Sequence, residues 1–159
     1  MLDHPQTPPL WINTPAALED AYLRIRPEPR IAVDTESNSL FAYQEEVCLI
    51  QISTPDQDFL FDPFVLKDLS LLGTLFNNKP QEKIFHASEY DLICLKRDFK
   101  FEFVNIFDTM IAARILGEAQ VGLGSLLTNK FGIILDKKYQ RANWGLRPLP
   151  AEMLDYARL

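Results

Sequence analysis

The pattern of apolar residues changes along the chain. From Arg30 to Asp62 they form short runs separated by turn-forming residues, which is typical of strands. Beyond Asp62 they recur at helical spacing, with short extended segments between the helices. Strands are predicted at Leu10–Ile12, Arg30–Glu36, Val47–Ser53, Phe59–Asp62, Lys83–Phe85 and Val104–Phe107. Helices are predicted over Pro15–Ile25, within 66–76, from Ser88 to about Arg97, from Asp108 to Leu116, over Gly122–Phe131 and from about Pro150.

Capping residues support several of these helix boundaries. Thr14 is followed by proline, which gives an N-cap and a proline in the first turn. Ser88 and Asp108 can cap the helices that follow them, and Gly132 can end the helix before it.

The order of the predicted elements indicates the fold class. A turn at 55–57 joins two strands, so the strands between residues 30 and 62 are expected to form an antiparallel meander. Strands and helices alternate afterwards. The prediction is a single α/β domain over 1–159, with a mixed sheet flanked by helices and with residues 1–9 loosely attached.

Composition narrows the class of protein. The chain has 159 residues, of which 47% are hydrophobic and 24% charged, enough for one ordinary core. No apolar stretch approaches the roughly 20 residues of a membrane span, and the first residues lack a secretory pattern. Cys48 and Cys94 are the only cysteines, so both are expected to be small core residues in a reducing cytoplasm.

Net charge restricts how the chain could bind nucleic acid. The formal charge of -6 argues against binding by bulk positive charge, so any nucleic-acid site must be local. Residues 130–159 carry a net charge of +3 and the first 129 residues carry -9. The positive segment also offers aromatic stacking surfaces, as expected for gripping a single strand. A solvated basic loop is the alternative. The candidate contacts are Lys137, Lys138, Gln140, Arg141, Trp144 and Arg147.

Two acidic residues end the first long strand. Asp34 and Glu36 are two positions apart, so their side chains leave the same face of the sheet, with Ala32 before them and Val33 on the other face. Neighbouring carboxylates repel one another unless they share a proton or a hard cation such as Mg²⁺. The pair therefore indicates a metal site or, alternatively, a solvated strand end.

A second candidate segment lies where a strand passes into a helix. It runs from His86 to Asp91 and places Asp91 in the first helical turn, where the helix dipole also favours a carboxylate. His86 could be a capping or core histidine as well as a catalytic one. Asp108 is interpreted as an N-cap in preference to a metal ligand.

These segments, in this order, resemble the ribonuclease D family of 3'-5' exonucleases from about residue 8 onward. The first family motif resembles Asp34-Thr35-Glu36, and the second resembles residues 86–91 with its final Asp as the functional carboxylate. An Asp-Thr helix like 108–113 and a basic stretch like 137–149 follow. The third motif, Tyr-x-x-x-Asp, begins at Tyr156.

The resemblance implies a ribonuclease H-like fold and a site of four acids and a tyrosine. It implies two divalent ions, Mg²⁺ or Mn²⁺, that flank the scissile phosphate. Asp34 is expected to bridge both ions, Glu36 to serve the water-activating ion, and Asp91 to serve the second ion directly or through water. Tyr156 is expected to orient the attacking water, with His86 and Asp108 in support.

The third motif departs from the family at its end. The sequence stops at Leu159, one residue before the fourth carboxylate, and neither Glu152 nor Asp155 is placed to replace it on a helix. We therefore expect the water-activating site to be incomplete and this chain to hydrolyse little.

The expected function is removal of nucleoside 5'-monophosphates from the single-stranded 3' end of RNA, such as a tRNA or another structured precursor. The alternatives are a DNA-directed repair exonuclease, a catalytically dead nucleic-acid-binding module and a protein-interaction scaffold on the same fold. Recognition of the 2'-hydroxyl would distinguish RNA from DNA.

Overall fold

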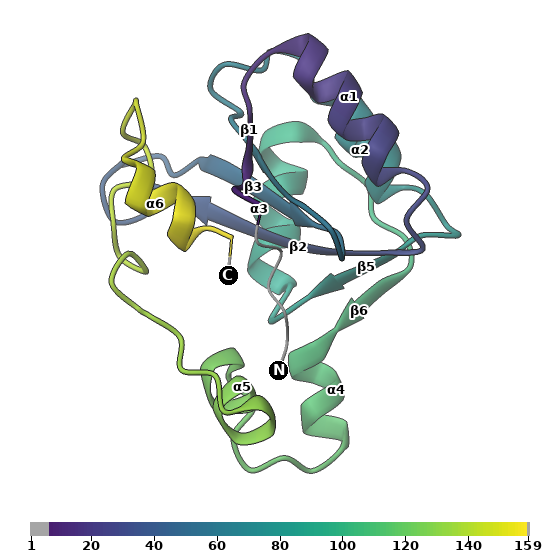
Figure 1. The fold of residues 1–159 in the computed structure, drawn as a ribbon, viewed down its shortest axis with the longest axis vertical. Helices are drawn as coiled ribbons and strands as arrows, with labels where there is room; N and C mark the ends of the chain where they lie inside the picture. Colours follow the sequence, from purple (N-terminus) through teal and green to yellow (C-terminus); the bar gives the residue numbers. More distant parts are fainter. Residues whose placement is uncertain (1–6, 159) are drawn as a thin grey trace.

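A computed structural model describes residues 7–158 of the chain, so most of the segment predicted to be loosely attached, residues 1–6, lies outside the described residues. The molecule is built on one six-stranded sheet in the order β1-β4-β3-β2-β5-β6 (Figure 1). The predicted α/β class, with a mixed sheet and flanking helices, is confirmed. The strands are β1 (Leu10–Ile12), β2 (Arg30–Ser37), β3 (Val47–Ser53), β4 (Asp58–Phe61), β5 (Glu82–Phe85) and β6 (Ile106–Asp108).

The sheet combines the predicted meander with parallel strands on both sides. β2, β3 and β4 pair antiparallel in sequence order, as predicted. β5 pairs parallel with β2, and β6 pairs parallel with β5. The short β1 lies parallel beside β4 at the other edge, a placement that the local sequence did not indicate.

The helices are α1 (Pro15–Ile25), α2 (Ser70–Phe76), α3 (Glu89–Phe99), α4 (Thr109–Ile115), α5 (Leu123–Phe131) and α6 (Ala151–Tyr156). Thr14 accepts a hydrogen bond from the Ala17 backbone N–H at 3.2 Å, so the predicted N-cap of α1 is confirmed. Gly132 follows α5 with a φ of 71°, a left-handed conformation that glycine adopts readily.

Two helix starts differ from the prediction. Leu66 and Leu69 are buried but precede α2, because the Asp68 carboxylate accepts the Ser70 backbone N–H at 2.8 Å and keeps the preceding segment in a turn. Ser88 stands at the N-cap of α3, but its hydroxyl donates to Asp108 at 2.8 Å instead of capping the helix.

Each face of the sheet has its own apolar cluster. One face packs against α1, α2 and α3 around side chains such as Ile31, Val33 and Ile52. The other face is covered by α6 and the irregular segment before it, whose buried side chains include Trp144, Leu149 and Met153. β3 and β4 contribute side chains to both clusters, and the acidic end of β2 is directed to the second face.

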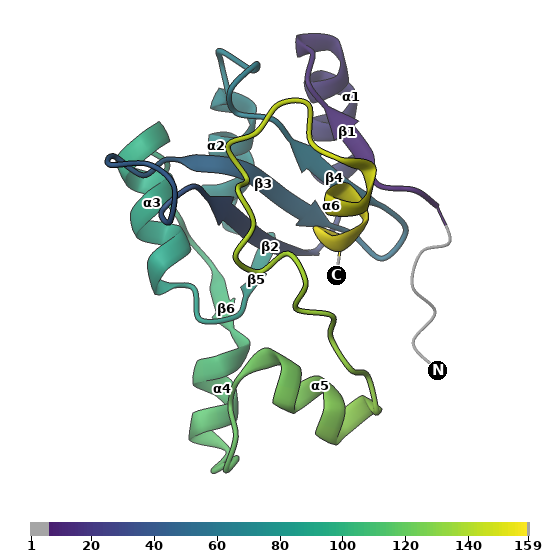
Figure 2. The same cartoon turned by 90° about the vertical axis from the view of Figure 1, so that its left-hand side faces the viewer.

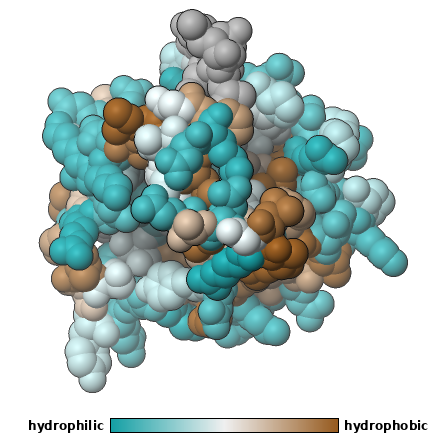
Figure 3. All heavy atoms as spheres, turned by 90° about the horizontal axis from the view of Figure 1, so that it is seen from below, coloured by the Kyte–Doolittle hydropathy of each residue, from teal (hydrophilic) through white to brown (hydrophobic). Residues whose placement is uncertain are grey.

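The helices α4 and α5 extend away from the sheet (Figures 1 and 2). None of the described residues of α5 is buried, and Ile115 and Phe131 are exposed at 81% and 57%. Figure 3 views the molecule from this end and shows apolar side chains among polar ones. No helix in the described part of the chain is both long and apolar enough to cross a membrane.

Candidate active site

The acidic end of β2 forms the floor of a cavity of about 540 Å³. Asp34 and Glu36 project from the face opposite to Val33, as their spacing predicts. Asp34 is paired with Gln51 of β3, which lines the same cavity. Tyr156, at the end of α6, lies on its wall. The fold thus brings three of the four predicted catalytic residues together at one cavity.

The electrostatics of this cavity disfavour bare carboxylates. Both acids remain reachable from the cavity, yet the surrounding chain desolvates them. Desolvation and the nearby charge of Asp91 raise the pKa of Asp34 to about 7. Desolvation, followed by the charges of Asp34 and Asp91, raises the pKa of Glu36 to about 8. A bound cation would relieve this repulsion.

Asp91 lies close to these two acids but does not line the cavity. It is buried in the first turn of α3, and its Oδ1 accepts a short hydrogen bond from the Thr35 hydroxyl. Burial raises the pKa of Asp91, while the bond from Thr35 opposes that shift. Thr35 thus fixes the third acid beside the strand that carries the other two.

Asp108 has a structural position, as the N-cap interpretation predicted. Its Oδ1 accepts the Met110 backbone N–H at 2.8 Å, and its Oδ2 accepts the Ser88 backbone N–H at 2.8 Å. Although burial opposes ionisation, hydrogen bonds from the backbone and hydroxyl of Ser88, and then from the backbones of Ile111 and Ala87, lower the pKa of Asp108 to about 2. Asp108 therefore joins the start of α4 to the start of α3.

His86 lies at the edge of the cavity and is held by a hydroxyl. Its Nδ1 is 2.8 Å from Oγ1 of Thr109, and that hydroxyl donates to the Phe85 carbonyl oxygen. Because a hydroxyl has one hydrogen, His86 Nδ1 must donate to Thr109, which leaves Nε2 as an acceptor in the neutral ring. Burial lowers the pKa of His86 and favours that neutral form.

The aromatic ring of Tyr156 is fixed by its neighbours. It packs edge-on against Tyr139 with ring centroids 5.7 Å apart. Desolvation, and then the charge of Glu36, raise the pKa of the Tyr156 hydroxyl. This tyrosine therefore stays protonated at neutral pH and can position a water by hydrogen bonding.

The predicted basic segment divides into two groups. Lys137 and Gln140 line the cavity beside the acids. Lys138 is turned towards Glu152, at 3.5 Å, and Arg141 is exposed. Since Glu152 also accepts the Tyr139 hydroxyl at 2.6 Å, it is engaged outside the cavity, in line with the expectation that it does not replace the fourth acid.

The structure corrects the expectation for Trp144. Its indole is 1% exposed and belongs to the apolar cluster on the second face of the sheet, beside Leu49 and Met153. A buried ring cannot stack on a base. The aromatic spacing that suggested a nucleic-acid contact instead reflects core packing.

Arg147 is also corrected to a structural role. Its guanidinium donates two hydrogen bonds to the buried carboxylate of Asp62, both at 2.8 Å, and a third to the Cys48 carbonyl oxygen at 2.7 Å. A further pair goes to the carbonyl oxygens of Trp144 and Leu146. With these partners, Arg147 anchors the irregular segment to the sheet instead of presenting its charge to a ligand.

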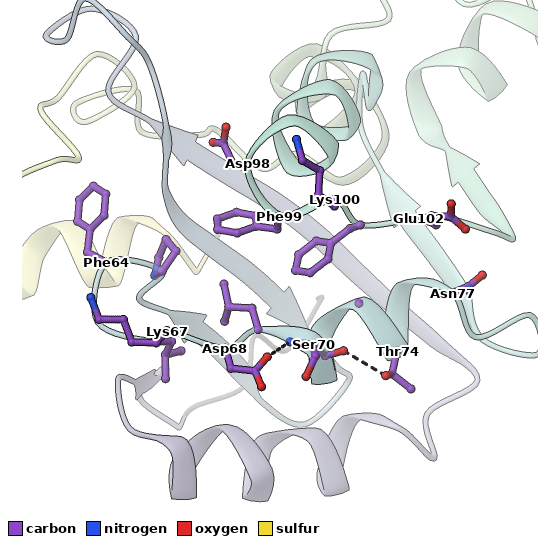
Figure 4. Close-up of a pocket in the computed structure, with 15 residues that line it drawn as sticks. Phe64, Lys67, Asp68, Ser70, Thr74, Asn77, Asp98, Phe99, Lys100 and Glu102 are labelled. Carbon is purple, nitrogen blue, oxygen red and sulfur yellow. Dashed lines mark hydrogen bonds between the residues drawn. The ribbon is translucent and has the colours of Figure 1, made fainter.

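The largest hollow described is a different feature, a groove of about 850 Å³ between α2 and the end of α3 (Figure 4). None of the predicted site residues lines it. Polar groups there find partners within the chain. For example, the Thr74 hydroxyl donates to the Ser70 carbonyl oxygen at 3.1 Å. The acids and the lysine instead meet at the smaller cavity.

The donor set at that cavity suits a hard divalent cation. Carboxylate oxygens are the ligands that Mg²⁺ and Mn²⁺ prefer, and the pKa values of Asp34 and Glu36 are raised by desolvation and by neighbouring negative charge. As the described side chains lie, no three His, Cys, Asp or Glu residues form a ready set of metal ligands, since Asp91 is turned to Thr35. Two acids therefore face the cavity and the third stands beside them.

Comparison with known families agrees with this arrangement. The sequence pattern of a family described as 3'-5' exonuclease matches residues 9–159. The chain belongs to this family. The exonuclease domain is also similar to curated proteins: it is 35% identical over 154 residues to the Exosome complex component 10 homolog of Drosophila melanogaster. It is 38% identical over 151 residues to the Exosome complex exonuclease RRP6 of Saccharomyces cerevisiae.

Solved structures show the same fold. The catalytic core of RRP6 from Trypanosoma brucei has a TM-score of 0.87 and 35% identity, covering 99% of this chain and 46% of that one. Escherichia coli RNase D, described as an exoribonuclease involved in structured RNA processing, has a TM-score of 0.89 and 29% identity, with 96% and 41% coverage. The resemblance to the ribonuclease D family is confirmed.

The exonuclease domain matches only part of each relative. The match to the Drosophila protein spans 96% of this chain but 17% of that protein. The match to the yeast protein spans 94% of this chain but 21% of that protein. What those longer proteins do as a whole is therefore not carried over directly.

The sequence analysis missed the parts played by Thr35 and Gln51. The bond from Thr35 to Asp91 depends on where α3 packs, which the local sequence does not show. Gln51 did leave a local signal, since it is a polar residue within the apolar run of β3.

Proposed function

We propose that this exonuclease domain is a metal-dependent 3'-5' exoribonuclease of ribonuclease D type. The observation that carries the proposal is the meeting of Asp34, Glu36, Tyr156 and Lys137 at one cavity, with Asp91 beside it. The proposed reaction is hydrolysis of the last phosphodiester bond at the 3' end of a single-stranded RNA, with release of a nucleoside 5'-monophosphate.

Each residue has a proposed part in that reaction. Asp34 and Glu36 hold the divalent ions, Mg²⁺ or Mn²⁺, and Asp91 contributes directly or through water. When bound, two such ions activate water and stabilise the leaving 3'-oxygen. Tyr156 donates a hydrogen bond that orients the attacking water, because its hydroxyl stays protonated. Lys137 and Gln140 hold the phosphate backbone at the cavity edge, and the exposed Arg141 and Lys138 extend the basic surface.

RNA is the proposed substrate because of the relatives. Escherichia coli RNase D is described as acting in structured RNA processing, and the RNase D of Trypanosoma brucei was solved in complex with RNA U12. A structured precursor such as a tRNA is therefore the proposed class, with DNA as the alternative outcome of the test. The buried, unpaired Cys48 and Cys94 support a reducing compartment such as the cytoplasm.

The test uses a 3'-labelled single-stranded RNA and its DNA counterpart, with Mn²⁺ binding measured by calorimetry. We expect the chain to bind Mn²⁺ and to release labelled mononucleotide only when Mn²⁺ is present. Metal-dependent release from RNA supports the proposal, and preferential release from DNA supports the alternative. RNA binding without Mn²⁺ binding or hydrolysis would identify a catalytically dead binding module.

Lys137→Ala is expected to weaken RNA binding about three- to tenfold and to lower the salt slope by about one, because one phosphate contact is lost. Fluorescence anisotropy across a salt series measures both. Lys67→Ala is the matched control, since Lys67 lies at the distant groove of Figure 4. Equal effects of the two changes would mean that the cavity edge does not contact RNA.

A further inference from the structure

Gln51 stands beside the central acid of the site. The register of β2 and β3 pairs it with Asp34, so the two side chains leave the same face of the sheet as direct neighbours. Gln51 lines the cavity of the acids and also an adjoining hollow of about 530 Å³. Only 6% of the residue is exposed.

The amide of Gln51 is a buried donor without a partner. Among residues 7–158, its Nε2 has no hydrogen-bond acceptor. The other two buried glutamines differ, because Gln57 Nε2 donates to the carbonyl oxygens of Pro8 and Asp58, and Gln81 Nε2 donates to those of Ile25 and Glu28. An unsatisfied buried donor is destabilising unless water, an ion or a ligand supplies an acceptor, and Gln51 differs from a core donor in that it lines a cavity.

The surroundings indicate what kind of acceptor completes it. Asp34 is the nearest acid, but its Oδ1 accepts from the Thr35 backbone N–H at 2.9 Å, and no bond joins it to Gln51. A phosphate that approaches two carboxylates needs neutral or positive donors around it. Gln51 supplies a neutral donor and Lys137 a positive one, and both line the same cavity.

We propose that Gln51 is a substrate-contacting residue whose Nε2 donates a hydrogen bond to a phosphoryl oxygen of the nucleotide bound over Asp34. The inference rests on the proposed function and adds to it a residue to which the family comparisons assign no part. A neutral amide suits this position, because it binds the anion without competing with the carboxylates for cations.

The test follows the side-chain amide signals of Gln51 by ¹⁵N–¹H NMR in the full chain with Mg²⁺. Gln51→Leu identifies these signals by their loss, and Gln57 provides reference signals from a satisfied amide. On titration with uridine 5'-monophosphate, the Gln51 signals are expected to shift until saturation while those of Gln57 stay in place. Uridine, which lacks the phosphate, is expected to leave the Gln51 signals unchanged.

Affinity and stability complete the test. Gln51→Leu is expected to bind uridine 5'-monophosphate about tenfold more weakly, as for a hydrogen bond to a charged group, with an equal or higher melting temperature. If backbone signals around Asp34 respond to the nucleotide but those of Gln51 do not, the inference is overturned and the proposed function stands. An equal response to uridine also overturns it. If neither the nucleotide nor RNA binds, both proposals fail.

Discussion

Asp34→Asn is expected to abolish RNA hydrolysis while raising the melting temperature. Loss of a carboxylate that would hold the divalent ions would remove several kcal/mol of transition-state stabilisation, or about a thousandfold in rate. The same change removes a desolvated carboxylate whose charge also raises the pKa of Glu36. Because Asp34 is partly solvated, the expected gain is about 1–2 kcal/mol, or roughly 3–6 °C.

The gain in stability should depend on pH. With pKa values of about 7 for Asp34 and about 8 for Glu36, the metal-free folded protein binds more protons than the unfolded chain between about pH 4 and 8. The two acids therefore do not lower the free energy of unfolding below pH 4. They lower it increasingly as the pH rises from about 4 to about 8. Asp34→Asn should match the parent below pH 4 and exceed it by a growing margin up to pH 8.

Thermal unfolding in EDTA across this range measures the effect, and release of labelled mononucleotide measures activity. Asp155→Asn is the control, since it changes an exposed carboxylate on α6 outside the cavity. A large drop in melting temperature for Asp34→Asn would contradict its assignment to the metal site.

Arg147→Met is expected to destabilise the protein by about 3–5 kcal/mol, because it leaves the carboxylate of Asp62 buried without its cation. The Asp62 side chain is 2% exposed and that of Arg147 is 23% exposed, so water cannot replace the guanidinium. The carbonyl oxygen of Cys48 loses its donor as well. Urea denaturation measures the change.

Two further variants separate charge from structure. Arg141→Met removes an exposed arginine of the same segment and is expected to change stability by less than about 0.5 kcal/mol. Adding Asp62→Leu to Arg147→Met should recover part of the loss, since no buried charge then remains. If Arg147→Met weakened RNA binding without loss of stability, the original interpretation of Arg147 as a nucleic-acid contact would be restored.

Local sequence patterns were enough to predict those features of the structure that depend on residues close together in the chain. The helix over Pro15–Ile25 was predicted with its observed bounds because Thr14 and Pro15 supply its start. The shared face of Asp34 and Glu36 follows from the alternation of any strand. Asp108 was predicted as an N-cap because its capping bonds reach backbone N–H groups only two and three residues onward.

Local patterns could not predict the roles of residues whose partners lie far away in the sequence. Trp144 and Arg147 look like nucleic-acid contacts in a basic, aromatic segment, yet one is buried in the core and the other binds Asp62, 85 positions away. The bond from Thr35 to Asp91 spans 56 positions. Spacing along the chain carries no information on such pairs.

The sequence by itself determined the strands and helices, the family resemblance and the acids that share a face, because each depends on short-range periodicity or on an ordered set of motifs. Only the tertiary structure decided that Lys137 and Tyr156 line the same cavity as Asp34, that Trp144 and Arg147 are structural, and that Gln51 keeps an unpartnered donor at the site. The physical reason is burial: whether a polar or aromatic side chain faces solvent, a ligand or the core depends on which segments pack over it.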